Sequence, residues 1–159
     1  MSETPDPQSA LKTIVDANRY MTLATADENG LPWASPVWYA TVDYHEFLWV
    51  SSPDARHSRN LSVRPEVAIV IFDSGQTPGS GQGVYLAATA AQLPDSELER
   101  AVAIFSETSQ SQGAPAWSRA DVEPPARLRL YRASAVQHFV LSGRDERLPV
   151  RVNQCAHLA

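Results

Sequence analysis

A succession of short β-forming segments joined by turns constrains the fold more than any other feature of the sequence. The segments cover residues 20–25, 33–42, 47–51, 66–73, 84–93, 127–132 and 135–141. Parallel neighbours in a sheet need long, usually helical crossovers, and a regular series of such crossovers is missing here. The sequence therefore predicts a mainly β (β+α) fold, a closed or nearly closed antiparallel β-barrel of six to seven strands with two to three short helices.

The turn signals arrange the first three segments. Asn29-Gly30 lies between two β-forming runs, and both residue types tolerate the positive φ of a tight hairpin turn. A second polar cluster, residues 43–46, precedes Phe47–Ser51, which places large apolar side chains on both faces of its strand. We therefore expect residues 20–51 to form a three-stranded antiparallel meander whose last strand is buried on both sides.

The 159-residue length fits one domain. Residues 1–8 are expected to form a disordered lead, because they are rich in proline and acidic residues and lack periodic apolar positions. Apolar residues at helical spacing then predict a helix over residues 8–18. We assign residues 9–141 to the single domain and expect the polar residues 142–159 to be an irregular C-terminal tail.

Two further helices are predicted from their end signals. Ser52 suits an N-cap, Pro53 suits the first helical position and Pro65 enforces a stop, so we expect a helix over residues 53–63. The second helix opens at Pro94 and carries an apolar stripe, and it gives way to a polar loop over residues 107–125.

Composition excludes several classes of function. The net charge of −5 disfavours nucleic acid as a partner, and no run approaches the ~20 apolar residues that span a membrane. The N-terminus lacks the basic and apolar stretches of a secretory signal, so a cytoplasmic location is expected. Cys155 is the only cysteine, and the four histidines share no ligand spacing, so no metal site is predicted.

One segment combines the groups that bind a phosphate. Ser51 and Ser52 precede the predicted helix, whose first turns carry Arg56, His57 and Arg59. A helix start offers free backbone N–H groups and positive potential, and a guanidinium adds a charged, forked donor. The segment therefore indicates a local anion site. The alternative is that these cations only cover a solvated helix face.

The order and spacing of four segments resemble the pyridoxamine 5′-phosphate oxidase-like family of FMN-binding split barrels. They are Ser35–Tyr39, Phe47–Ser51, Ala55–Leu61 and Pro65–Ala68. The resemblance is detailed over residues 20–72 and looser over 84–141. It implies a split β-barrel that binds FMN and works as a homodimer, with the cofactor at the subunit interface.

The resemblance also assigns roles to residues. In that family a Ser or Thr ending the third strand and a cationic pair opening the next helix hold the cofactor phosphate, while the preceding strand lies against the flavin ring. The candidate cofactor-binding residues are accordingly Ser35, Pro36, Val37 and Trp38 for the ring, and Ser51, Ser52, Arg56, His57 and Ser58 around the phosphate.

Two departures from the oxidase itself limit the functional assignment. His57 stands where lysine is usual, and the C-terminal tryptophan-and-arginine pattern of the true oxidases is absent after Leu141. We expect an FMN-dependent oxidoreductase that acts on a small organic molecule other than pyridoxamine phosphate, with no catalytic residue singled out. Alternatives are an F420-dependent reductase, a flavin- or haem-binding protein without turnover, and a structural dimer with an empty groove.

Overall fold

The computed structural model describes residues 6–153 and confirms a mainly antiparallel β fold with a few helices. Three α-helices and one 3-10 turn are present in this range: α1 (Pro7–Ala17), α2 (Arg56–Val63), α3 (Asp95–Ser111) and η1 (Arg119–Asp121). The strands form one eight-stranded sheet: β1 (Tyr20–Ala26), β2 (Pro32–Trp38), β3 (Ala40–Val42), β4 (Glu46–Ser51), β5 (Glu66–Phe72), β6 (Gly83–Gln92), β7 (Arg129–Leu141) and β8 (Arg147–Val150).

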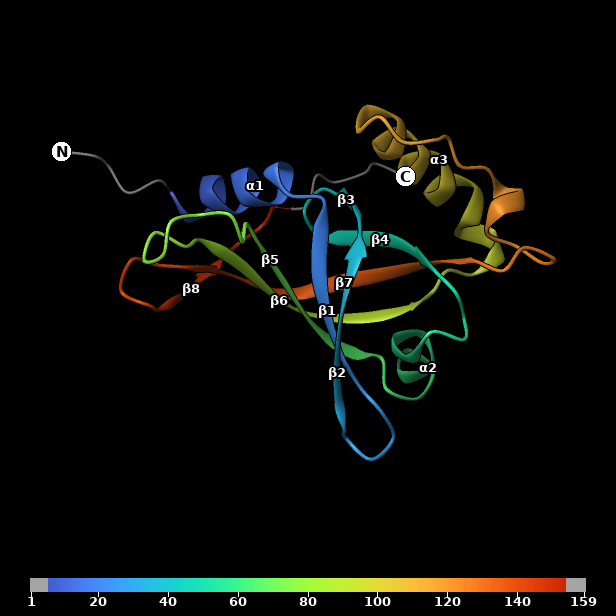
Figure 1. Cartoon of the computed structure of the whole chain (residues 1–159), viewed down its shortest axis with the longest axis horizontal. Coiled ribbons are helices and arrows are strands. Elements are labelled where there is room, and N and C mark those ends of the chain that lie inside the picture. Colours follow the sequence, from blue (N-terminus) through green and yellow to red (C-terminus); the bar gives the residue numbers. More distant parts are fainter. Residues whose placement is uncertain (1–5, 154–159) are drawn as a thin grey trace.

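The strand order explains why the sheet curls into a barrel. The order is β2-β1-β5-β6-β7-β4-β3, so β2 and β3 lie at opposite ends of the paired path, yet only Tyr39 separates them in the chain. One residue cannot span a flat sheet, so the sheet bends until its two ends meet (Figure 1). β2 and β4 approach each other without pairing, which is the split in the barrel.

This arrangement corrects the predicted meander. The expected strand over residues 33–42 breaks at Tyr39, and its halves join different neighbours: Trp38 pairs with Tyr20 of β1, whereas Ala40 pairs with Leu48 of β4. The backbone N–H of Tyr39 donates to the carbonyl of Arg19 at 3.1 Å, which extends the contact with β1 by one residue before the chain enters β3. The break accounts in part for a strand count above the expected six to seven.

Alternating side chains fill the barrel, and α1 closes part of it. Inward residues of the strands form one buried cluster, which Leu11, Ile14 and Val15 of α1 join. The helix begins at Pro7 with Asp6 as its N-cap, because the Asp6 carboxylate accepts the backbone N–H of Ser9 at 3.2 Å. The predicted disordered lead is therefore wrong for residues 6–8, while residues 1–5 lie outside the described residues.

A second buried cluster covers the outer face of the sheet at β4. Leu48 and Leu130 point outward and pack beneath Val102 and Phe105 of α3. Phe47 and Trp49, the neighbours of Leu48 along β4, belong to the barrel interior. β4 is therefore buried on both faces, as its sequence predicts.

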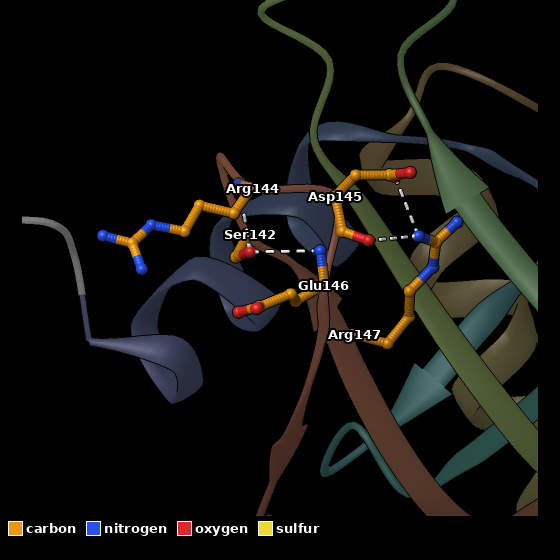
Figure 2. Close-up of polar contacts among 5 residues, drawn as sticks. All are labelled: Ser142, Arg144, Asp145, Glu146 and Arg147. Carbon is orange, nitrogen blue, oxygen red and sulfur yellow. Dashed lines mark hydrogen bonds and ion pairs between the residues drawn. The ribbon is translucent and has the colours of Figure 1, made fainter.

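The C-terminal part of the chain departs from the prediction. Residues 129–141 form one 13-residue strand, not two, and its register against β6 shifts between Ala87 and Ala88, where Val136 of β7 has no partner residue. Residues 142–150 are not irregular: Figure 2 shows the turn that brings β8 back along β7, with the Ser142 hydroxyl accepting from two backbone N–H groups. Residues 154–159 lie outside the described range.

The start of α2 also differs from expectation. The helix begins at Arg56, after a turn in which the Ser52 hydroxyl accepts from the N–H of Asp54 at 3.2 Å. Ser52 is thus not the helix N-cap, a position held by Ala55 without a side-chain cap. α3 runs to Ser111, past the predicted loop start at 107. Between residues 6 and 153, no helix is long and apolar enough to cross a membrane.

The Tyr39 hydroxyl gives a test of the closure. It lies 2.6 Å from the carbonyl of Val15 and 3.1 Å from that of Asn18, where it holds the end of α1 against the β2–β3 link. Tyr39→Phe leaves these acceptors without that donor, so we expect a loss of about 1–2 kcal/mol of unfolding free energy in urea denaturation. Tyr131→Phe, at a tyrosine whose hydroxyl bonds to no described residue and whose ring stacking on Trp49 is kept, is the matched control. Equal stability of the two variants would contradict this role.

Candidate functional site

One histidine of α2 joins two strands at the split of the barrel. The Nε2 atom of His57 lies 2.8 Å from the Ser51 hydroxyl at the end of β4, and its Nδ1 atom lies 3.2 Å from the Ser35 hydroxyl on β2. Ser35 is buried, and His57 and Ser51 are half-buried. The structure thus brings together three residues that the sequence names as candidates, from three separate elements.

The surroundings of His57 favour its neutral form. Burial lowers the pKa of the imidazole below its ordinary value of about 6.5. A neutral imidazole donates through one nitrogen and accepts through the other, while each serine hydroxyl can do either. Both ring nitrogens therefore have a compatible partner without a charge on the ring. The same hydroxyls and imidazole can donate to an anion once the ring takes up a proton.

Arg56 supplies the permanent positive charge beside this cluster. Its guanidinium lies 4.3 Å from the ring centroid of Trp33, in a cation–π contact. Trp33 is 42% exposed, and it is not among the candidate residues named from the sequence. The signal that could have found it is the strand period: Trp33 precedes Ser35 by two residues, so both side chains project from the same face of β2.

Hydrogen bonds fix α2 against the β1–β2 hairpin. The buried Asn60 amide donates to the Thr25 hydroxyl at 2.9 Å, and that hydroxyl lies 3.3 Å from the carbonyl of Trp33. At the end of the helix, the Arg64 guanidinium donates to the carbonyls of Asp27 and Glu28 in the hairpin turn. The helix that carries Arg56 and His57 and the strand that carries Trp33 and Ser35 are therefore held as one unit.

The hairpin turn itself is built by local chemistry. The Asp27 carboxylate accepts the backbone N–H groups of Asn29 and Leu31, both at 2.9 Å, and Gly30 adopts a φ of +82°. Of the Asn-Gly pair, only the glycine takes the left-handed conformation. The predicted hairpin is present, with a longer loop than a two-residue turn.

The remaining candidates lie apart from the cluster. Val37 points into the barrel core, and Pro36 is exposed on the outer face. Trp38 packs edge-on against Phe105, with ring centroids 5.3 Å apart, and its Nε1 donates to the Gln112 side chain at 2.7 Å. Ser58 is buried on α2 with no partner for its hydroxyl. The side chains of these residues do not converge on Arg56 and His57.

The donor set suits a phosphate. A guanidinium, an imidazole and hydroxyl groups are side-chain donors whose hydrogen bonds phosphate oxygens accept. Among the described residues, no acidic side chain bonds to Arg56, His57, Ser35 or Ser51. A metal is not what these groups would hold: within residues 6–153 no three His, Cys, Asp or Glu side chains converge. An FMN phosphate fits the residues present.

Solved structures with the same fold include two haem proteins and a flavin protein. A heme binding protein from Mycobacterium smegmatis has a TM-score of 0.73 at 22% identity. The match covers 92% of this chain and 58% of that protein, so this chain spans little more than half of that protein's length. The heme storage protein HutZ from Vibrio cholerae has a TM-score of 0.67 at 23% identity, with 84% of this chain and 93% of that one covered. An FAD-binding protein from Mesorhizobium loti has a TM-score of 0.59 at 20% identity, covering 84% and 90%.

At these identities the likeness establishes the fold alone. No curated protein sequence matches the chain. A family model described as pyridoxamine 5′-phosphate oxidase matches residues 7–136, which is most of the chain. The matched range begins with α1 and ends within β7, so it includes the His57 cluster and the whole β1–β2 hairpin. The chain belongs to the pyridoxamine 5′-phosphate oxidase family.

Proposed function

We propose that this protein binds FMN and uses it as an oxidoreductase on a small organic molecule. The observation that carries the proposal is the convergence of His57, Ser35 and Ser51 beside the Arg56 guanidinium. These groups lie at the first turn of α2, where backbone N–H groups add positive potential. Family membership supports a flavin as the source of the phosphate.

In this proposal the chain binds and orients, and the cofactor supplies the redox chemistry. Arg56 and the protonated His57 neutralise the phosphate, and the hydroxyl of Ser51 donates to it. The ring of the flavin would lie along β2, where the backbone of residues 35–37 can address its polar edge. Bound FMN accepts and donates hydride equivalents. No side chain near the cluster is assigned as a general acid or base.

F420 and haem are less well supported by the side chains present. The longer acidic tail of F420 would need further cations, but Arg64 is bonded to two hairpin carbonyls, and Arg59 lines a separate cavity behind α2. Haem needs an axial ligand, and the buried His138 has its Nε2 2.8 Å from the carbonyl of Tyr44. The solved haem proteins of this fold keep haem as the second candidate.

A second copy of this chain is the partner we propose. Outward positions of β1, β5, β6 and the end of β7 form a mostly apolar patch made of Tyr20, Thr22, Val70, Phe72, Tyr85 and Phe139, and the Arg147 guanidinium lies 5.0 Å from the Tyr85 ring centroid. Tyr20 is 62% exposed and Phe72 is 50% exposed. A continuous, mostly apolar sheet face is typical of a self-complementary interface.

The test of the cofactor is a titration of the purified protein with FMN, F420 and haem in turn, followed by absorption and fluorescence. We expect saturable binding of FMN at one site per chain and weaker binding of the other two. Bleaching of bound FMN by NADH or NADPH under anaerobic conditions would support turnover. Saturation by haem alone would instead support the haem-binding alternative.

Arg56 gives the sharpest test of the phosphate contact. Arg56→Met keeps an apolar side chain over Trp33 but removes a charge-assisted bond of about 1.5–3 kcal/mol, so FMN affinity should fall about 10- to 100-fold. Riboflavin, which lacks the phosphate, should bind wild-type protein and variant alike. Arg144→Met, at an exposed turn, is the control and should leave FMN affinity unchanged. An unchanged affinity in Arg56→Met would refute the phosphate role.

The pH dependence of FMN binding tests His57. Burial holds the pKa of free His57 low, and an adjacent phosphate favours its charged form, so binding takes up a proton. Affinity should therefore rise as the pH falls from about 8 to about 6.5, by at most about tenfold per pH unit. His57→Gln keeps hydrogen-bonding groups but cannot titrate, and its affinity should be flat over this range in isothermal titration calorimetry. A parallel slope in the variant would exclude His57 as the proton acceptor.

A carboxylate introduced into this apolar patch tests the dimer. Phe72→Glu places a carboxylate in the proposed interface, where desolvation without a partner costs several kcal/mol, so the variant should be monomeric. Val63→Glu changes an equally exposed apolar residue at the end of α2 and should leave the mass unchanged. Sedimentation equilibrium measures both. A wild-type monomer at micromolar concentration would contradict the proposal directly.

A further inference from the structure

We propose that a cavity behind α2 is a second binding site, for a small organic anion with a flat apolar body. The cavity has a volume of about 390 Å³, within the range of ligand pockets. Its walls come from α2 and the chain that follows it, from the end of β6 and from β7, and they include Ser58, Arg59, Leu61, Pro65, Gln92 and Tyr131.

A buried hydroxyl without a partner points to a ligand here. Ser58 lines the cavity and is 4% exposed, and its Oγ has no hydrogen-bond partner among residues 6–153; this atom lies beneath the cavity surface, so a ligand contacts it once the side chain rotates about χ1. An unpaired buried hydroxyl costs about as much as a lost hydrogen bond, so such groups call for a missing partner. The only other unpaired buried side-chain atom among residues 6–153 is Nε1 of Trp49. The Trp49 ring stacks on Tyr131, which lines the same cavity, with centroids 5.6 Å apart.

The sheet adds unpaired backbone groups to this wall. β5 pairs with one edge of β6 and begins at Glu66. The last backbone hydrogen bond along that edge of β6 runs from the N–H of Ala90 to the carbonyl of Pro65, at 2.8 Å. β6 continues to Gln92 without a strand neighbour on that side. Backbone groups alternate sides along an antiparallel strand, so the N–H and C=O of Gln92 face the same side as those of Ala90. They can donate to and accept from a ligand.

The charge of the cavity selects an anion. Arg59 is its only charged lining residue, and no carboxylate lines it. One Nη atom of Arg59 donates to the carbonyl of Asp54 at 2.9 Å, which leaves further guanidinium N–H groups for a ligand. Leu61, Pro65 and the Tyr131 ring supply apolar contact. A carboxylate on an aromatic or similarly flat body matches this combination of one cation, a hydroxyl and apolar walls.

The proposal for this cavity is independent of the proposal that the protein binds FMN. His57, the residue before Ser58, holds Ser35 and Ser51 at the split of the barrel, and none of these three residues lines the cavity. The two sites therefore share a helix but no side chain. Loss of FMN binding would leave the cavity proposal untouched, and the reverse also holds.

The test is an NMR titration of ¹⁵N-labelled full-length protein with benzoate, and with benzamide as the neutral analogue of the same shape. We expect saturable shifts of the backbone amides of Ser58, Arg59 and Gln92, and weaker binding of benzamide by at least about fivefold. Shifts centred on Arg56 and His57 instead would mean that benzoate binds the first anion site, and would overturn the proposal. The absence of saturable shifts at the cavity amides would overturn it as well.

Two variants separate binding from structure. Arg59→Met removes the cation but keeps an apolar stem, and should weaken benzoate binding at least about tenfold, whereas Arg144→Met should not. Ser58→Ala removes the unpaired hydroxyl, so it should weaken binding while leaving the urea midpoint unchanged or higher. A lower midpoint in Ser58→Ala would show that the hydroxyl is satisfied within the fold. That result, or unchanged binding in both variants, would overturn the proposal.

Discussion

The one-residue link at Tyr39 is the constraint on which the rest of the structure depends. It joins strands from opposite ends of the paired path and so forces the sheet to close on itself. Closure brings β2 beside β4, and only then can Ser35 and Ser51, sixteen positions apart in the chain, reach the two nitrogens of one imidazole. The hydroxyl of Tyr39 also donates to the carbonyl of Val15 near the end of α1. The same residue therefore links the closed sheet to the helix whose apolar side chains pack into the barrel core.

Sequence patterns predict those elements whose signal is local. Alternating apolar residues locate most strands, and helical spacing locates α1 to within about a turn. The break at Tyr39 has no local signal, because no glycine or proline marks it and its cause is pairing with two distant strands. The expected turn within 127–141 fails for a related reason: β7 pairs with β4 through its first half and with β6 through most of its length, and these ladders keep it extended.

Those residues of the candidate site that lie on α2 and at the end of the preceding strand could be predicted from the sequence, whereas those that reach the site through tertiary packing could not. Cations in the first turn of α2, after a serine-ending strand, indicate an anion site from sequence alone. The position of Ser35 beside them comes from the family resemblance, since residues on separate strands meet only through the fold. Trp33 was missed because an aromatic strand residue is usually core, and Ser52 was misplaced because its hydroxyl serves the preceding turn and not the helix.

The half-exposed indole at the rim of the cluster has an optical consequence. Trp33 touches Arg56, the residue that we propose binds the cofactor phosphate. It is the tryptophan most open to solvent within the described chain, since Trp49 is fully buried and the other two pack against Phe105. Its near-ultraviolet emission is therefore an intrinsic label at the proposed anion site. Occupancy of that site by a phosphate that does not absorb light would become visible without any added fluorophore.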